Sequence, residues 1–209
     1  MSKATVEYHR NTALDKEQNN LSAGYGYTLN LGTIGTTDVF SAGDLKYIYD
    51  RVDSAHSIGG NILFTWFRNS SSFNWNTNNF YSGNTRSLFL SLYGGTQYQD
   101  IFKSDKSEIK GFILRPLYTA NISYAFTDPA SPAHPPIVKF AVLYTGRYDV
   151  VNTSDNKEDY TQLLKTSADW FIVRGNIKVS LGVSYNTGSD PMQGLKTQSY
   201  WLFSLNFLK

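Results

Sequence analysis

The sequence predicts an all-β protein: a single domain over residues 1–209, folded as one closed antiparallel β-barrel that crosses a membrane. Two observations lead to this prediction. Aromatic residues make up 15% of the chain and charged residues only 17%, whereas an average soluble domain has about 25% charged residues. In addition, extended segments alternate apolar and small polar side chains over lengths greater than the roughly 5–6 residues of an ordinary strand.

The composition narrows the class of protein further. Mean hydropathy is −0.35, and no window approaches the roughly 18 consecutive apolar residues that a membrane helix requires. The longest mostly apolar stretches, such as residues 61–67, are strand-sized. The chain has no cysteine, which excludes disulfides and thiolate metal sites. A net charge of +2 without a basic stripe argues against a nucleic-acid partner.

Residues 111–126 show the clearest alternation. One face carries no charge and has aromatic residues at both ends with smaller apolar residues between them, as expected of a lipid-facing strand with aromatic girdles. The same period recurs in residues 21–31, 138–149, 164–173 and 177–186. The opposite faces hold mainly Ser, Gly, Thr and Asn with scattered charges. A soluble sandwich or lipocalin-like barrel also alternates, but its outward face is rich in Lys and Glu, so the pattern favours the membrane barrel.

The alternation predicts ten strands, with twelve as the alternative. Bacterial single-chain barrels have an even number of strands and both termini on one side, which predicts alternating short and long connections. Residues 68–85 are too long for a short turn, so either two further strands lie there or the side assignment is wrong in the N-terminal half. The Pro-rich residues 127–136 are not a strand interior, because proline lacks the ladder donor. The ten predicted strands lie near residues 4–11, 21–31, 42–52, 60–67, 86–97, 109–126, 137–149, 162–174, 177–187 and 197–208.

The C-terminal residues 198–208 resemble the closing strand of bacterial outer-membrane β-barrels, the porin-like superfamily. Trp201, Phe203, Leu205 and Phe207 supply the alternation of aromatic and apolar residues that this strand has, although Leu208 and Lys209 displace the usual terminal aromatic by two positions. The resemblance implies a Gram-negative outer membrane, its lipid and its assembly machinery as partners, and it identifies no subfamily. Residues 1–5 have no signal-peptide core. We therefore expect that a start methionine and a short linker replaced a signal peptide, and a lost periplasmic domain upstream is left open.

The inward faces of the later strands carry a net basic set of side chains. Rings of Lys and Arg in a pore favour anions. The alternative is that Lys165 pairs with Asp169 and Arg147 with Asp149 or a neighbour, so that salt bridges fill the interior. The predicted pore-lining residues are Arg115, Lys139, Arg147, Asp149, Lys165, Asp169 and Lys178.

Catalytic and metal sites have weaker support. Asp53, His56 and Ser57 could form a base–nucleophile set, yet the same residue types are common in turns. Two acidic groups lack the glycine and regular alternation of a calcium loop, and the chain has no phosphate-binding or dinucleotide fingerprint. We expect no cofactor, no bound metal and no enzyme activity. The acidic groups are Asp100, Asp105 and Glu108, and Asp155, Glu158 and Asp159.

The leading hypothesis is a small, passive outer-membrane channel for small polar solutes with a modest preference for anions. A second is a non-transporting barrel that acts in surface recognition or adhesion through its loops, or that forms the barrel part of an export port. A third, less favoured hypothesis is an outer-membrane hydrolase.

Overall fold

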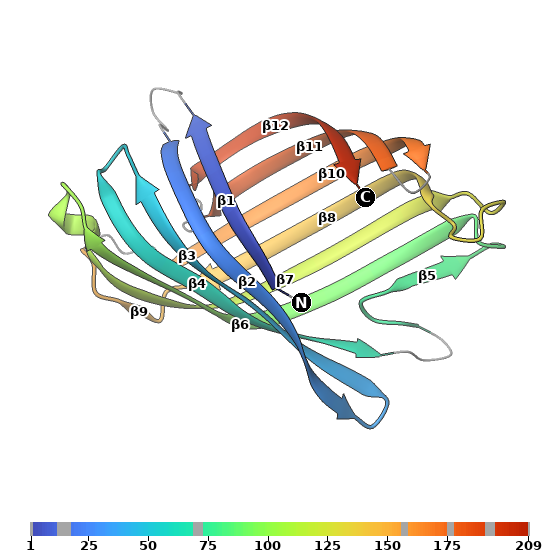
Figure 1. Ribbon diagram of the computed structural model, residues 1–209, viewed down its shortest axis with the longest axis horizontal. Helices are drawn as coiled ribbons and strands as arrows, with labels where there is room; N and C mark the ends of the chain where they lie inside the picture. The colour runs from blue at the N-terminus through green and yellow to red at the C-terminus, as the bar shows by residue number, and fades with distance from the viewer. Residues whose placement is uncertain are drawn as a thin grey trace.

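The computed structural model describes residues 2–11, 18–68, 73–155, 159–174, 178–190 and 195–208, without the side chains of residues 9–11, 18, 195–196 and 207–208. All described strands belong to one antiparallel sheet of twelve strands (Figure 1), which confirms the predicted all-β antiparallel class. The only described helical piece is the 3-10 turn η1 (Ser107–Ile109). No described helix is long and apolar enough to span a membrane.

Ten long strands follow one another in the hydrogen-bonded order β1-β2-β3-β4-β6-β7-β8-β10-β11-β12. Two short strands lie off this path: β5 (Asn78–Tyr81) pairs with β6, and β9 (Val151–Asn152) pairs with β7. The long strands are β1 (Ser2–Asn11), β2 (Gln18–Ile34), β3 (Thr37–Asp50), β4 (Ala55–Arg68), β6 (Arg86–Lys103), β7 (Gly111–Thr127), β8 (Pro136–Tyr148), β10 (Tyr160–Arg174), β11 (Lys178–Asp190) and β12 (Leu195–Leu208).

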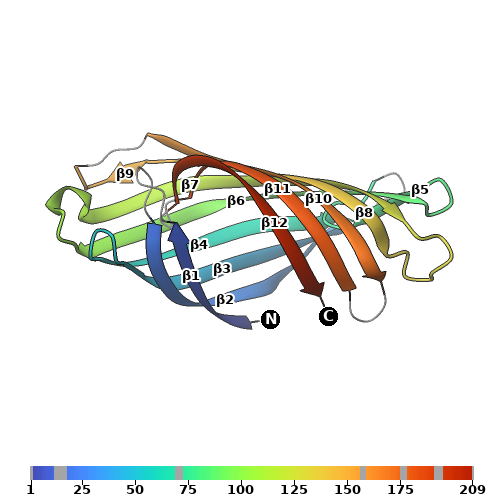
Figure 2. The ribbon, with the colours of Figure 1, turned by 90° about the horizontal axis from the view of Figure 1, so that it is seen from above.

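The sheet curls into an incomplete cylinder. Its edge strands β1 and β12 turn toward each other, and both chain termini lie at the same end, called here the terminal end (Figures 1 and 2). No backbone pairing joins β1 to β12 among the described residues, so the sheet is open between them. Closure of the barrel and its final strand number therefore remain predictions.

Each of the ten predicted ranges overlaps one strand of the main path, but several strands extend further. Strand β6 continues to Lys103, six residues beyond the predicted end. The alternation ends earlier because Asp100 occupies an outward position that other strands fill with apolar residues, while its backbone remains paired with β7 at Phe112. The hydrophobic pattern thus marks only the part of each strand with a uniformly apolar outer face.

The segment between β4 and β6 contributes one short strand rather than the two that a twelve-stranded path would need. β6 pairs with β4 only up to Gly94, and the end of β6 nearer Arg86 pairs instead with β5. The backbone N–H of Asn76 also donates to the Leu90 carbonyl at 3.0 Å. This segment folds back along β6 because the longer strand leaves unpaired backbone groups there. Since it lies at the terminal end, the expectation of short connections at that end is wrong for this segment.

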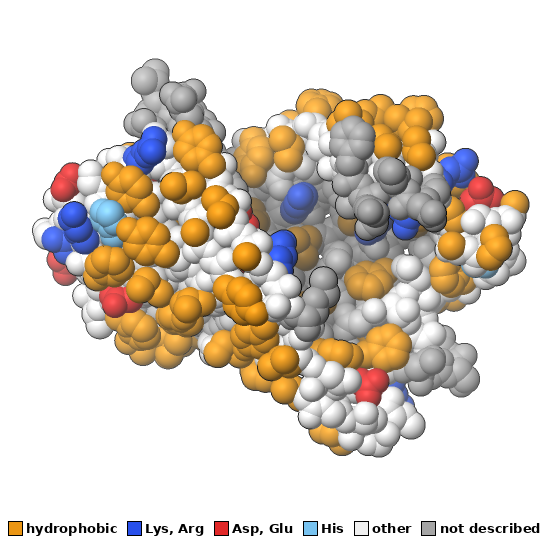
Figure 3. Space-filling view, in the orientation of Figure 1, with side chains coloured by type: hydrophobic (Ala, Val, Ile, Leu, Met, Phe, Trp, Pro, Cys, Tyr) orange, Lys and Arg blue, Asp and Glu red, His pale blue; other side chains and the backbone are white. Residues whose placement is uncertain are grey.

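Burial in the sheet is inverted relative to a soluble domain. Among the described residues, most buried side chains are polar, and many large apolar side chains are exposed. The largest fully buried side chain is Gln97, whereas Phe203 is 79% exposed. Figure 3 shows hydrophobic side chains spread over the outside of the curved sheet. Because successive side chains of a strand point to opposite faces, the sheet has a polar inner face and an apolar outer face.

Along the paired central parts of β7, β8 and β10, the exposed side chains of the outer face form three zones. Tyrosines lie near the end opposite the termini, which we call the loop end; aliphatic residues lie between; and Trp and Phe lie near the terminal end. The antiparallel registers align these zones from strand to strand. The zones contain, in that order, Tyr118, Tyr148 and Tyr160; Ile122 and Val142; and Phe126, Phe140 and Trp170.

Candidate functional site: the polar inner face

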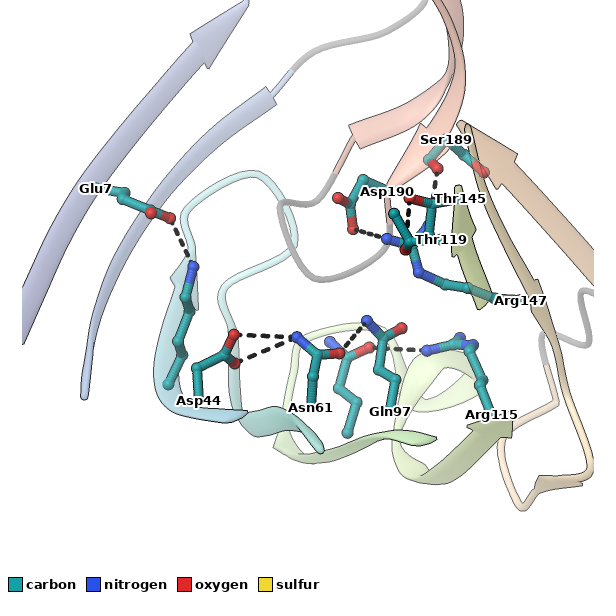
Figure 4. Close-up of polar contacts among 12 residues, drawn as sticks. Glu7, Asp44, Asn61, Gln97, Arg115, Thr119, Thr145, Arg147, Ser189 and Asp190 are labelled. Carbon is teal, nitrogen blue, oxygen red and sulfur yellow. Dashed lines mark hydrogen bonds and ion pairs between the residues drawn. The ribbon is translucent and has the colours of Figure 1, made fainter. Parts of the chain in front are cut away.

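Polar side chains from strands that are not neighbours meet on the inner face. Lys46 of β3 contacts Glu7 of β1 across β2, and Arg147 of β8 contacts Asp190 of β11 across β10. Such contacts form on the concave side of a curved sheet, where side chains from alternate strands converge. Figure 4 shows these groups pointing toward one another from several strands.

The central ion pair joins two predicted pore-lining residues. The Nε of Arg115 donates to Oδ1 of Asp149 at 2.5 Å, and the two side chains are only 4% and 5% exposed. Arg115 also donates to Oε1 of Gln99 at 3.4 Å, and Asp149 accepts a bond from Asn152 at 2.8 Å. Asp149 follows β8 directly, and β9 holds this stretch against β7. The pair therefore lies where the long strand ends and the short one begins.

Arg147 is bound to a residue that the sequence did not single out. Its Nη2 lies 3.1 Å from Oδ1 of Asp190, and its Nη1 donates to the Ser189 carbonyl at 3.5 Å. The alternative of a filled interior had Arg147 pairing with Asp149 or a neighbour; Asp149 binds Arg115 instead, and the partner of Arg147 is Asp190. Side chains two residues apart on one strand point in parallel, so each finds its partner on another strand.

A chain of amides and carboxylates continues across β3, β4 and β6. Asn61 donates to Asp44 at 3.1 and 3.3 Å and accepts a bond from Gln97 at 2.9 Å. Lys46, two positions beyond Asp44 on the same face, binds Glu7 at 2.9 Å. A cavity of about 280 Å³ opens beside these groups. Lys46 and Glu7 neutralise each other on this part of the inner face, and the cavity beside them remains open.

The remaining predicted pore-lining residues lie on the same face with fewer contacts. Asp169 accepts a bond from Asn206 at 3.4 Å. Lys139 lies opposite Asp169 in the β8–β10 register, but no ion pair involving Lys139, Lys165 or Lys178 occurs within the part of the chain that the structure describes. The pairing of Lys165 with Asp169, which belonged to the alternative of a filled interior, is therefore not found among the described residues. Figure 3 shows basic side chains within the hollow that the sheet encloses.

The sequence reasoning missed the inner-face groups of the first half of the chain. These are Asp44, Lys46, Asn61 and Gln97. Their signal was present, because Asp44 and Lys46 occupy alternate positions in a stretch with apolar residues at 45, 47 and 49. Asp190 gave no signal, since the predicted strand ended at residue 187 while β11 continues to Asp190.

The structure does not bring Asp53, His56 and Ser57 together as a catalytic set. His56 and Ser57 are consecutive in β4 and point to opposite faces. Ser57 is buried on the inner face, while His56 stacks on Tyr49 with ring centroids 4.7 Å apart. Asp53 lies 2.6 Å from Nζ of Lys106, and this contact raises the pKa of the Lys106 ammonium group.

The acidic loop groups also do not form a cation site in the described part of the chain, where no three carboxylates or histidines gather. Glu158 lies outside the described residues.

Comparisons with protein-family models, with curated proteins and with solved structures found no match to this chain. The fold and the inner face are therefore the basis for the functional proposal.

Proposed function

We propose that the chain is a small outer-membrane β-barrel that lets small polar solutes pass through its lumen, with a modest preference for anions. The observation that carries this proposal is the inverted burial: polar and charged side chains are enclosed by the sheet, and large apolar side chains are exposed outside it. In water such a surface would be an aggregation liability, because monomeric soluble proteins rarely expose large contiguous apolar areas. In a bilayer the same surface is matched by hydrocarbon.

The spacing of the aromatic zones supports a membrane rather than a protein partner around the barrel. Tyr160 and Trp170 mark the two zones on β10 and are 45% and 58% exposed. Their separation in sequence corresponds to about 33 Å along a strand at roughly 3.3 Å per residue. At a tilt of about 40° this spans about 25 Å along the membrane normal, the height of the apolar band in transmembrane barrels.

We infer that β1 and β12 pair in the membrane and close the barrel. The main path has ten strands, each antiparallel to the next, so β1 and β12 run in opposite directions as an antiparallel closure needs. An open edge in hydrocarbon leaves backbone groups without partners, each costing several kcal/mol, of order 2–7. The outward Trp201, Phe203 and Leu205 of β12 would then face lipid, and the same strand would be the one that the assembly machinery reads.

The preference for anions rests on inner-face cations without acidic partners. Lys139, Lys165 and Lys178 make no ion pair among the described residues, whereas Arg115 and Arg147 are neutralised by Asp149 and Asp190. Unpaired cations in a pore favour anions. Lys165 is the exposed member of this group.

A non-transporting barrel is the second candidate, and the buried Arg115–Asp149 pair favours it. Side chains of a ten-stranded barrel can fill much of the interior, and this pair together with Gln97 and Gln99 fills part of it. Loops at either end would then carry a recognition or adhesion function.

Planar-bilayer recordings on the refolded protein test the proposal. We expect stepwise currents and, in a tenfold KCl gradient, a reversal potential on the anion side but well short of the about 59 mV of full selectivity. Lys165→Glu should move this potential toward the cation side. Lys110→Glu, an equal charge change in the connection between η1 and β7, is the control and should move it less. Silence from a correctly folded protein would refute the channel and leave the non-transporting barrel.

A further inference from the structure

The edge strands β1 and β12 each keep one side free and face each other across the opening of the sheet (Figure 2). In the described part of the chain, β1 pairs only with β2 and β12 only with β11. Val6 and Phe203 on these edges are 77% and 79% exposed, the highest values among the large apolar side chains that the structure describes. Val183, which lies opposite Phe203 on β11 and has a strand on each side, is half-buried. The high exposure at the edges therefore reflects a missing neighbouring strand.

The registers of the other nine pairings fix how β1 and β12 are displaced relative to each other. A line drawn from Gln198 on β12 through directly opposed residues reaches Ser2 on β1 after one step along β7 and two steps along β2. All three steps run toward the loop end, so Ser2 lies three residues nearer that end than a line without steps would reach. The line passes through Gln198, Gly188, Leu163, Thr145 and Thr119, then Tyr118, Gly94, Phe64, Ser41 and Leu29, and finally Tyr27 and Ser2.

This displacement limits the ways in which the barrel can close. The displacement along the strands after one full circuit is the shear of a barrel. If Gln198 pairs with Asn11, nine residues beyond Ser2 toward the loop end, the shear is twelve residues. Only even shears bring outward side chains opposite outward ones. The even shears from eight to fourteen pair nine or all ten residues of β1 with β12, and other even values pair fewer.

Strand tilt and complete pairing together select a shear of twelve. With roughly 3.3 Å per residue and about 4.8 Å between strands, shears of eight, ten, twelve and fourteen tilt ten strands by about 29°, 35°, 40° and 44°. Barrel strands typically tilt by about 35–45°, which excludes eight and leaves ten at the lower limit. A shear of fourteen leaves Ser2 opposite no residue of β12, which ends at Leu208. Twelve pairs all of β1 and lies at the centre of the range of tilts.

The outward side chains favour the same register. A shear of twelve places Tyr8 opposite Trp201, whose ring already lies 5.1 Å from that of Tyr185 on β11. Tyr8 would then continue this aromatic row across the seam, and aromatic pairs on opposed strands stabilise a sheet. A shear of ten would instead place Tyr8 opposite Ser199 and Trp201 opposite Val6.

We propose that the free edge of β1 binds β12 of the same chain at a shear of twelve, with Thr5 opposite Ser204 and Val6 opposite Phe203. The inference rests on the closure stated under the proposed function and deepens it, because it names the residues that meet. On the inner face this register brings Lys3 opposite Asn206. Lys3 makes no ion pair among the described residues. Closure therefore adds a further cation to the wall on which the preference for anions depends.

Cysteine cross-linking tests the register, and the chain contributes no cysteine of its own. The two double variants are Thr5→Cys with Ser204→Cys on the inner face and Val6→Cys with Phe203→Cys on the outer face. Consecutive antiparallel pairs alternate between Cα separations of about 5.5 and 4.5 Å, and both separations allow a disulfide. The full chain is refolded in phosphatidylcholine vesicles and oxidised with copper phenanthroline. Gel mobility of the heat-denatured chain and mass spectrometry measure the cross-link.

Matched controls move the second cysteine by two residues on the same face. Thr5→Cys with Leu202→Cys reports a shear of ten, and Thr5→Cys with Asn206→Cys reports a shear of fourteen. Diagonal neighbours lie about 7–8 Å apart, beyond the reach of a disulfide without backbone movement. We expect the Thr5–Ser204 variant to cross-link on the order of tenfold faster than either control.

Each other outcome overturns the proposal in a recognisable way. A control pair that cross-links faster would give a different register for a closed barrel. Cross-links between chains would make a second copy the partner of each edge, and no cross-link in a folded chain would leave the edges apart. If the outer-face variant does not fold, the inner-face pair decides, since it replaces two small polar side chains. None of these readouts needs ion conduction, so a silent barrel with the expected cross-link would refute the channel and keep the register.

Discussion

The Arg115–Asp149 pair offers the sharpest test of how the inner face is packed. We consider the single variants Arg115→Met and Asp149→Leu and the double variant that combines them. Both side chains are at most 5% exposed, so each single variant leaves an uncompensated buried charge. The expected loss of unfolding free energy is about 3–5 kcal/mol for each single variant.

The double variant should be much less destabilised than the sum of the single variants. Simple addition gives about 6–10 kcal/mol from the single losses. The double variant leaves no unpaired charge and loses only the bonds to Gln99 and Asn152, at about 1 kcal/mol each. A total near 2 kcal/mol corresponds to a coupling energy of about 4 kcal/mol or more.

Reversible urea unfolding in lipid vesicles, followed by tryptophan fluorescence, measures these quantities. Lys165→Met is the matched control, because it removes an inner-face cation that has no ion pair among the described residues; its effect should stay within about 0.5 kcal/mol. A coupling energy below about 1 kcal/mol would match an exposed pair in water. That result would refute the packed geometry of Arg115 and Asp149 and would place a water-filled passage around them.

Two further substitutions test the outer face and the sheet. Ile122→Lys in the aliphatic zone should cost about 2–4 kcal/mol in vesicles, whereas Asn121→Lys on the inner face should cost under about 1 kcal/mol; equal costs would contradict the lipid contact. Gly95→Ala should cost about 1–3 kcal/mol, because its Cβ would clash with the Ile62 carbonyl oxygen and lie 2.9 Å from the Leu63 Cα. Gly94→Ala is the control: its Cβ would meet nothing within 4 Å, and it should be neutral or stabilising by about 0.4–1 kcal/mol. If the Gly95 variant were as stable as the Gly94 variant, the register between β4 and β6 would be wrong.

The sequence predicted a strand best where apolar and polar side chains alternate along the whole segment. Residues 111–126 alternate without interruption, and β7 covers almost the same range. The inward positions 115 and 117 are buried there, and Tyr118 and Ile122 are exposed outside. The side assignment of the basic residues followed from the same period of two, because it depends only on the alternation of side chains along a strand.

The prediction of side-chain contacts failed where the partner lies far away in the sequence. The pairing of Asp149 with Arg115 rather than Arg147 depends on the bend between β8 and β9. The partnership of Arg147 with Asp190 depends on the irregularity at Gly188 and on the curvature of the sheet. Neither ion pair leaves a periodic pattern in the sequence from which it could be predicted.

The class of structure follows from the amino-acid pattern alone, since a period of two with apolar residues on one side specifies a sheet with two unlike faces. Which polar groups meet is set by the three-dimensional fold, because contacts across alternate strands depend on how far the sheet curls. It also decided that residues between β4 and β6 fold back as a single short strand along β6. Alternation is a local property of one strand, whereas curvature, register and pairing are properties of the whole sheet.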